Sequence, residues 1–300
     1  MEFNKKSLTL SEQINLLKNR GLIIDDNVSA ENFLSNISYY RLRAYFHTFY
    51  IDTLNPEHLF KTNTNFNDII NLYVFDRKLR ILVFDAIEKI EVSLRTQIIY
   101  HLSLKFGNLW FQDESLFISE KFFSECLKNF DDELNRTSEI FIDHYKNKYG
   151  NPQRPPAWMM LEIVSIGTLS KLYRNLKMSD AKKKVANHFY SKHPFVLESW
   201  IQSLSFIRNI CAHHQRLWNR KITIKPTIPK FFNEENLLKH TEFNIDKIFS
   251  ALCIIIHLLK IISPTDKLRY KFKELLQKYP VAKVSNMGFP YDWEEFNIWK

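Results

Sequence analysis

The chain has 300 residues, of which 45% are hydrophobic and 25% charged, and its formal net charge is +9. These values exclude a disordered or fibrous protein and indicate a globular chain that is long enough to bury a core. The excess of positive charge favours a polyanion such as nucleic acid as the partner, and a solvated basic surface without a partner is the alternative.

The small numbers of glycine and cysteine residues narrow the possible fold classes and compartments further. Five glycines are few for a fold with many tight turns or a glycine-rich phosphate loop, so helices are favoured. Cys126, Cys211 and Cys253 are far apart and show no CxxC spacing, which is typical of a reducing compartment. The N-terminus has no signal-peptide core, and the apolar run 252–262 is too short to span a bilayer. We therefore expect a cytoplasmic protein without a membrane segment or cofactor.

Helical signals dominate the N-terminal half. Residues 9–20 predict a capped helix that ends at Gly21, and residues 30–50 predict a second helical region. The longest periodic segment is 66–105, where apolar residues return at helical spacing. Residues 118–148 predict a further helix of mixed charge.

The C-terminal half follows a proline-rich break at 151–156. Helices are predicted over 157–177, 179–190, 194–220, 243–262 and 265–278. The tail from Pro280 is irregular and rich in aromatic residues. The sum is an all-α protein of about eight to ten helices around a helical bundle. We expect one domain over 1–300 with a helical extension over 1–60, and any internal boundary near residue 108 or 151.

One segment, RNICAHHQRLWNR at 208–220, concentrates Arg and His. On a helical wheel the polar stripe contains Asn209, His213, Arg216 and Arg220. Arg208 flanks this stripe, whereas His214 falls among apolar neighbours. His suits proton transfer near neutral pH, and Arg matches a phosphate. The segment is thus a candidate RNA-cleaving site; the alternative is a solvent-facing polar stripe with His214 as a packed core residue.

The chemistry that this segment would support needs no metal. A 2′-hydroxyl attacks the adjacent phosphate, with His213 as base or acid, Arg208 stabilising the phosphate charge and Asn209 orienting either group. The products are a 2′,3′-cyclic phosphate and a 5′-hydroxyl. One His cannot easily make both proton transfers, so a second copy in a homodimer would supply the other. A metal site is not expected, because HExxH and CxxC are lacking and the adjacent histidines point to different helix faces.

Charged residues in the long periodic segment have two interpretations. Glu91 and Arg95, like Asp76 and Arg80, are four residues apart. They are either surface ion pairs or a network that supports the 208–213 segment from a facing helix. The surface interpretation is favoured for Asp76–Arg80, and both remain open for Glu91–Arg95, whose carboxylate sits in a mostly apolar stretch. Supporting roles are also assigned to His214 and Arg216.

Other basic side chains are candidate phosphate contacts. They are Arg41, Arg43, Arg77, Arg220, Lys182, Lys183 and Lys184. The lysine run is otherwise a solvated face. The stretch 39–50 interleaves aromatics with Arg, and its aromatics, Tyr40 and Phe46 among them, are expected in the core, with stacking on RNA bases as the alternative.

Three stretches carry a resemblance to a known family: RNICAHHQRLWNR, YYRLRAYFHTFY at 39–50 and FDRKLRILVFDAIEKIEVSLRTQI at 75–98. Their order and spacing resemble the Abi-like (AbiD/AbiF) abortive-infection family of bacterial phage-defence proteins, in the HEPN superfamily. The family's catalytic motif is an Arg, a polar residue and a His about five positions later, which Arg208, Asn209 and His213 match. The resemblance covers most of residues 10–260.

The resemblance implies a HEPN-type helical bundle with additional N-terminal and C-terminal helices. It also implies an endoribonuclease toxin that acts on RNA and is held in check by a small structured RNA antitoxin. One motif per chain, where related CRISPR ribonucleases carry two, implies a homodimer. Two alternatives remain: a non-catalytic RNA-binding helical protein, and a partner-sensing protein that uses an exposed aromatic tail from Phe289 to Trp299.

Overall fold

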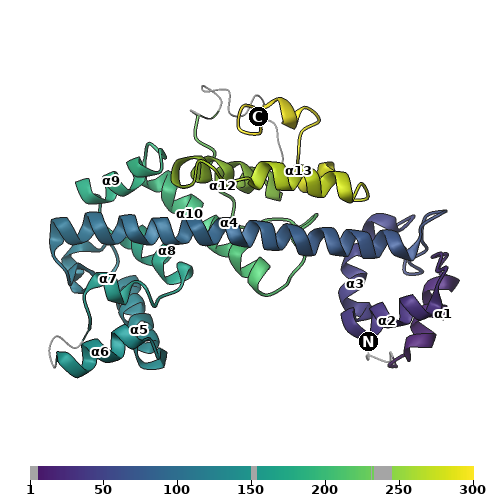
Figure 1. Ribbon diagram of the computed structural model, residues 1–300, viewed down its shortest axis with the longest axis horizontal. Helices are drawn as coiled ribbons and strands as arrows, with labels where there is room; N and C mark the ends of the chain where they lie inside the picture. The colour runs from purple at the N-terminus through teal and green to yellow at the C-terminus, as the bar shows by residue number, and fades with distance from the viewer. Residues whose placement is uncertain (1–5, 150–153, 231, 233–244) are drawn as a thin grey trace. The chain divides into compact units, whose positions relative to one another are not determined.

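The computed structural model describes residues 6–149, 154–230, 232 and 245–300. The elements of this described part are helices, joined by loops and a few isolated β-bridges, which confirms the predicted all-α class (Figure 1). The chain forms two compact units, one of residues 1–80 with 272–283 and one of residues 81–271 with 284–300. No helix in the described ranges is both long and apolar enough to cross a membrane.

The first unit contains three short N-terminal helices and parts of two longer ones. The short ones are α1 (Leu10–Asn19), α2 (Asn27–Ile37) and α3 (Tyr39–Phe46). The unit also holds the start of α4 (Phe66–Phe106) and most of α13 (Leu268–Lys278). Thr9 and Glu12 form the capping box that starts α1, as the sequence predicts. The predicted helical region 30–50 is divided by Ser38, whose φ of 64° interrupts the helix.

The second unit contains the rest of α4 and most of the remaining helices. These are α5 (Glu120–Arg136), α6 (Ile140–Lys148), α7 (Ala157–Met160), α8 (Ile166–Asn175), α9 (Asp180–His188), α10 (Pro194–Ala212) and α12 (Ile248–Ile262). The segments 118–148 and 157–177, each predicted as one helix, are two helices apiece. These divisions bring the described part to twelve α-helices, above the eight to ten expected.

Helix α8 packs against α10, the helix that carries the start of the 208–220 segment. Gly167 in α8 lies beside α10, where an added Cβ would stand 3.6 Å from the Oγ of Ser205. Leu169 and Leu172 on α8 and Leu204 on α10 are almost completely buried. The apolar run at 252–262 lies within α12 and is largely buried, as expected.

The aromatic tail is packed, which corrects the expectation that it is exposed. Phe289, Trp293, Phe296 and Trp299 are all buried. Phe249 of α12 meets the rings of Phe289 at 4.6 Å and Trp299 at 6.3 Å between centroids. Tyr291 alone among the described tail aromatics remains 95% exposed. Burying such large rings stabilises the fold, so the tail completes the core of the second unit.

Candidate functional site

Arg208 and Asn209 lie in the last turn of α10. This helix begins at Pro194, in the position where proline is favoured, and buries Val196, Trp200 and Leu204. Asn209 is exposed, and Arg208 is half-buried. The guanidinium carbon of Arg208 lies 5.5 Å from the ring centroid of Phe84 in α4, a cation–π contact that holds the side chain against a neighbouring helix. Arg208 is therefore oriented by packing.

The helix ends at Ala212, so the prediction of a helix through residue 220 is wrong. His213 is the C-cap, and His214 follows it with a φ of 55°. The N–H of Gln215 donates to the Ile210 carbonyl at 3.0 Å, and the N–H of His214 donates to the Cys211 carbonyl at 3.1 Å. This pair of bonds is the Schellman motif, in which glycine is the usual residue at the position of His214.

The Schellman turn changes what the wheel predicted for the second half of the motif. His213 and His214 are both exposed, so the interpretation of His214 as a packed core residue is wrong. Beyond His213 the chain no longer follows the wheel, and Arg216 and Arg220 belong to the loop after α10. The loop is anchored by Leu217 and Trp218, which are buried. One helix end thus presents two imidazoles, an amide and a guanidinium.

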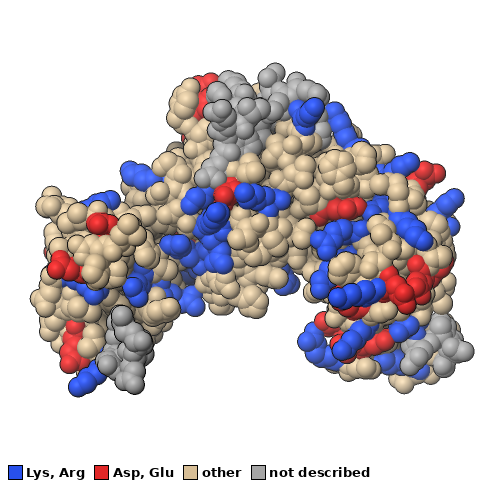
Figure 2. All heavy atoms as spheres, turned by 180° about the vertical axis from the view of Figure 1, so that it is seen from behind, with Lys and Arg blue, Asp and Glu red and all other residues tan. Residues whose placement is uncertain are grey.

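Basic side chains gather in the loop after α10 and at the start of α12. Arg220 donates to the Arg216 carbonyl at 3.5 Å, and the Nζ of Lys247 donates to the Asn219 Oδ1 at 2.6 Å. Burial lowers the pKa of Lys247, and the nearby charge of Arg216 lowers it further. Figure 2 shows Lys and Arg atoms concentrated in the middle of the face seen from behind. Mutually repelling cations of this kind favour an anion between them.

Two lysines and one aspartate lie next to these residues. Lys221 and Lys225 both pair with Asp246, and Lys225 foremost holds the pKa of that carboxyl below its usual range. The sequence offered no signal for Lys247 or Asp246, because they lie about thirty residues beyond the motif and approach it only through the tertiary fold.

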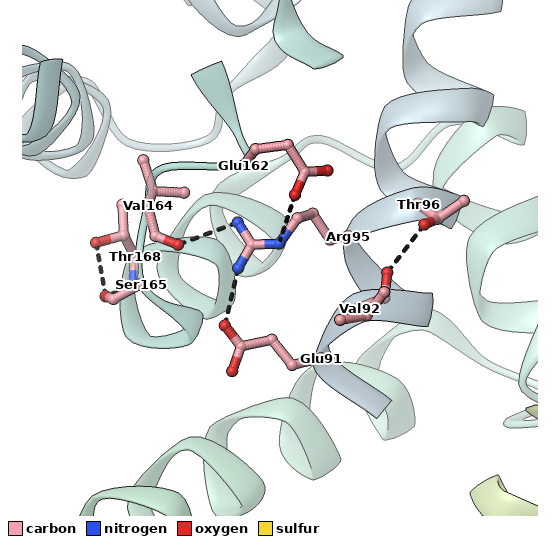
Figure 3. A network of polar contacts seen from close by, with 8 residues as sticks. All are labelled: Glu91, Val92, Arg95, Thr96, Glu162, Val164, Ser165 and Thr168. Carbon is pink, nitrogen blue, oxygen red and sulfur yellow. Dashed lines mark hydrogen bonds and ion pairs between the residues drawn. The ribbon is translucent and has the colours of Figure 1, made fainter. Parts of the chain in front are cut away.

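The Glu91–Arg95 pair, for which a surface ion pair and a supporting network were both open, forms a network with the turn before α8. Arg95 donates to the Glu91 Oε1 at 2.8 Å and to the Val164 carbonyl at 3.0 Å, and lies 3.9 Å from the Glu162 Oε2 (Figure 3). Arg95 is only 6% exposed. The network therefore fixes the turn that precedes α8, the helix that packs on α10.

Asp76 and Arg80 are buried, so the surface interpretation of this pair is wrong. In the first unit they form an ion pair, the Tyr45 hydroxyl donates to the Asp76 Oδ2 at 2.6 Å, and Arg80 donates to the same hydroxyl at 3.4 Å. Burial, and then the charge of Asp76, raises the pKa of Tyr45 well above its usual range. Tyr45 is the residue that sequence reasoning missed, because it lies 31 positions away from Asp76.

The candidate phosphate contacts divide into exposed and structural residues. Arg41 and Arg77 in the first unit, and Lys183 and Lys184 on α9, are exposed. Arg43 is half-buried and contacts His58 at 3.3 Å.

Lys182 is 2% exposed and is therefore not a phosphate contact. Its Nζ donates to the Leu176 carbonyl at 2.6 Å and pairs with Glu198 at 2.8 Å, so this lysine joins α9 to α10. Lys182 also lies over the ring of Tyr173. The lysine run thus has one buried and two exposed members, because the helix turns its first lysine toward the core.

The aromatics of the 39–50 stretch divide in the same way. Phe46 and Tyr45 are buried as expected, whereas Tyr40 is 81% exposed and its assignment to the core is wrong. Across the described residues, no group of three or more His, Cys, Asp or Glu side chains is arranged to hold a metal ion, and the three cysteines are buried.

A family model described as "Abi-like protein" matches residues 32–219, more than half of the chain. The chain belongs to the Abi-like family. The match confirms the resemblance seen in the sequence, and in this Abi-like chain it includes Arg208, Asn209 and His213 but ends before Arg220 and Lys247. No curated protein and no solved structure matches the chain.

Proposed function

We propose that this Abi-like chain is a metal-independent endoribonuclease toxin of bacterial phage defence by abortive infection. The observation that carries the proposal is the exposed imidazole of His213, one turn after Asn209, at the end of the helix that also carries the oriented guanidinium of Arg208. The basic loop with Arg216, next to this helix end, provides the charge that an RNA backbone requires.

The reaction is a transesterification within RNA. A base takes the proton of a 2′-hydroxyl, the 2′-oxygen bonds to the adjacent phosphorus, and the bond from phosphorus to the 5′-oxygen breaks. An acid returns a proton to that 5′-oxygen. His213 takes one of the two proton transfers, Arg208 stabilises the charge on the non-bridging oxygens, and Asn209 orients the imidazole or the phosphate.

Two groups are candidates for the second proton transfer. A second copy of the chain in a homodimer would bring another His213, as the single motif per chain suggests. His214 is the other source, and its exposure in the Schellman turn supports including it. Control of the toxin by a small structured RNA belongs to the same proposal, because the basic surface suits an inhibitory RNA as well as a substrate.

Cleavage of RNA in EDTA by the purified protein tests the proposal. We expect products with 5′-hydroxyl and 2′,3′-cyclic phosphate ends, and a loss of roughly 100-fold or more in the rate for His213→Ala. His144→Ala is the matched control, because it removes another exposed imidazole of the second unit. Cleavage that requires a divalent metal, or that His213→Ala leaves unchanged, would contradict the assignment.

A non-catalytic RNA-binding protein is the second candidate, and the basic surface supports it equally. It predicts RNA binding by the wild type and by His213→Ala, without new 5′-hydroxyl ends from either. The hypothesis of partner sensing through an exposed aromatic tail loses its support, because Phe289 and Trp299 are buried.

A further inference from the structure

A pocket of about 720 Å³ lies within the first unit, lined by residues of α1 and the segment before it, of the start of α3 and of the loop that precedes α4. Its volume falls in the range of small-molecule sites, roughly 300–1,000 Å³. Lys6, Arg20, Arg43 and His58 line it, and the lining contains no Asp or Glu among the described residues. The pocket is therefore positively charged, and it belongs to the first unit whereas the 208–213 segment belongs to the second.

Among the described residues, both guanidiniums of the pocket contact neutral groups. Arg20 donates to the Tyr39 hydroxyl at 2.8 Å. Arg43 contacts the Nε2 of His58 at 3.3 Å, and because a guanidinium only donates, this nitrogen is the acceptor of a neutral imidazole. Burial raises the pKa of Tyr50, and the positive charges of both Arg20 and Arg43 oppose that shift. With no carboxylate among the described lining residues, the two cations favour a bound anion.

The pocket also offers an aromatic surface and strained backbone. Tyr40 lines it with 81% of its surface exposed, next to Tyr39 on the same helix start. Leu16 adds an apolar contact. Two lining residues that are not glycine, Ser38 and His58, have positive φ angles of 64° and 54°. Backbone strain of this kind clusters at ligand sites.

We propose that this pocket binds a nucleotide, with its phosphate on Arg20 and Arg43 and its base stacked on Tyr40. Planar guanidiniums match a phosphate, and an exposed tyrosine ring stacks on any base. The nucleotide is either a free mononucleotide or one unit of a single-stranded RNA. The site is separate from the cleavage site and does not depend on the cleavage proposed above.

Binding of two probes to the full chain tests the pocket. Adenosine 5′-monophosphate is measured by calorimetry, and a short fluorescent 2′-O-methyl oligoadenylate, which cannot be cleaved by 2′-hydroxyl attack, by anisotropy. We expect Arg20→Ala, Arg43→Ala and Tyr40→Ala each to weaken binding of the recognised probe roughly tenfold, while Tyr40→Phe retains it. Binding of the monophosphate identifies a free nucleotide as the ligand, and binding of the oligonucleotide alone identifies RNA.

The controls separate the pocket from other causes. Lys18→Ala removes an exposed cation of α1 that does not line the pocket and should bind as the wild type does. The monophosphate arm involves no RNA cleavage, which keeps its outcome distinct from the cleavage test. Tyr40 is exposed, so Tyr40→Ala should fold even if an Arg variant does not, and ultraviolet crosslinking of a 5-bromouridine oligonucleotide should label Tyr39 or Tyr40. Failure of both probes to bind the wild type, or wild-type binding by Tyr40→Ala, would overturn the proposal.

Discussion

His214 is unusual at the level of the single residue, because it holds a left-handed backbone at a position where glycine is the common choice. Its φ of 55° costs an L-residue roughly 1–2 kcal/mol, and its side chain is exposed. Strained residues often occur at functional sites. The adjacent His213 has an ordinary φ of −87°, so of these two histidines His214 alone carries backbone strain.

Replacing His214 with glycine distinguishes a structural role from a catalytic one. We expect His214→Gly to raise the free energy of unfolding by about 1 kcal/mol, since glycine adopts this φ without strain. His213→Gly, as control, relieves no strain and should not stabilise. Urea unfolding measures both. RNA cleavage that survives His214→Gly assigns the second proton transfer to a second chain, whereas a loss of more than tenfold assigns it to His214.

Among the elements, α4 and the turn before α8 are joined by one side chain. Arg95 makes its ion pairs and hydrogen bond with Glu91, Glu162 and the Val164 carbonyl, and it is nearly buried. Removing one partner of a buried pair leaves the others unsatisfied, which costs more than the pair contributes. The stability of the α8 turn should therefore depend strongly on this residue.

Substituting Arg95 tests that dependence. We expect Arg95→Ala to lower the free energy of unfolding by about 2–4 kcal/mol. Arg136→Ala is the control: Arg136 also pairs with a glutamate on its own helix, but its side chain is 77% exposed, so the cost should stay below about 0.5 kcal/mol. Equal effects of the two variants in chemical denaturation would show that burial of the Arg95 network contributes nothing.

At the scale of the whole molecule, the chain has a net charge of +9, and both units carry exposed cations. Arg41 and Arg77 lie in the first unit, and Lys183 and Lys184 in the second. Each phosphate that a cation neutralises releases counterions, so RNA affinity should fall steeply with salt. Lys182 contributes to the same net charge but is buried with Glu198. Net charge alone therefore overstates the charge available to RNA.

The salt dependence of binding to 2′-O-methyl RNA distinguishes the exposed Lys183 and Lys184 from the buried Lys182. If Lys183 and Lys184 both contact phosphates, their double substitution by Ala should reduce the slope of log affinity against log salt by about 1.4. Lys182→Ala should leave the slope unchanged and instead lower the free energy of unfolding by about 1–3 kcal/mol, because Glu198 loses its partner. A change of slope in Lys182→Ala would contradict its structural role.

Local patterns were sufficient for the helical class, for the start of α1 and for the length of α4. Apolar periodicity and capping residues act within a few positions, so the sequence displays them directly. The end of α10 was misplaced although it too is local. Its Schellman turn uses His214 in place of the glycine that normally signals such an end. The helical wheel grouped Asn209 and His213 with Arg208 alongside, and the resemblance to the family motif then assigned their roles.

Burial and pairing depended on residues far apart in the chain. Buried Asp76 accepts a hydrogen bond from Tyr45, and buried Lys182 pairs with Glu198 and donates to the Leu176 carbonyl. Phe249 of α12 packs against the ring of Phe289 in the tail. Helical periodicity assigns a residue to a face but does not say what covers that face. The residue types of the motif are therefore visible in the sequence. The contacts around them, and the pocket of Arg20 and Arg43 in the first unit, arise only when segments far apart in the chain pack together.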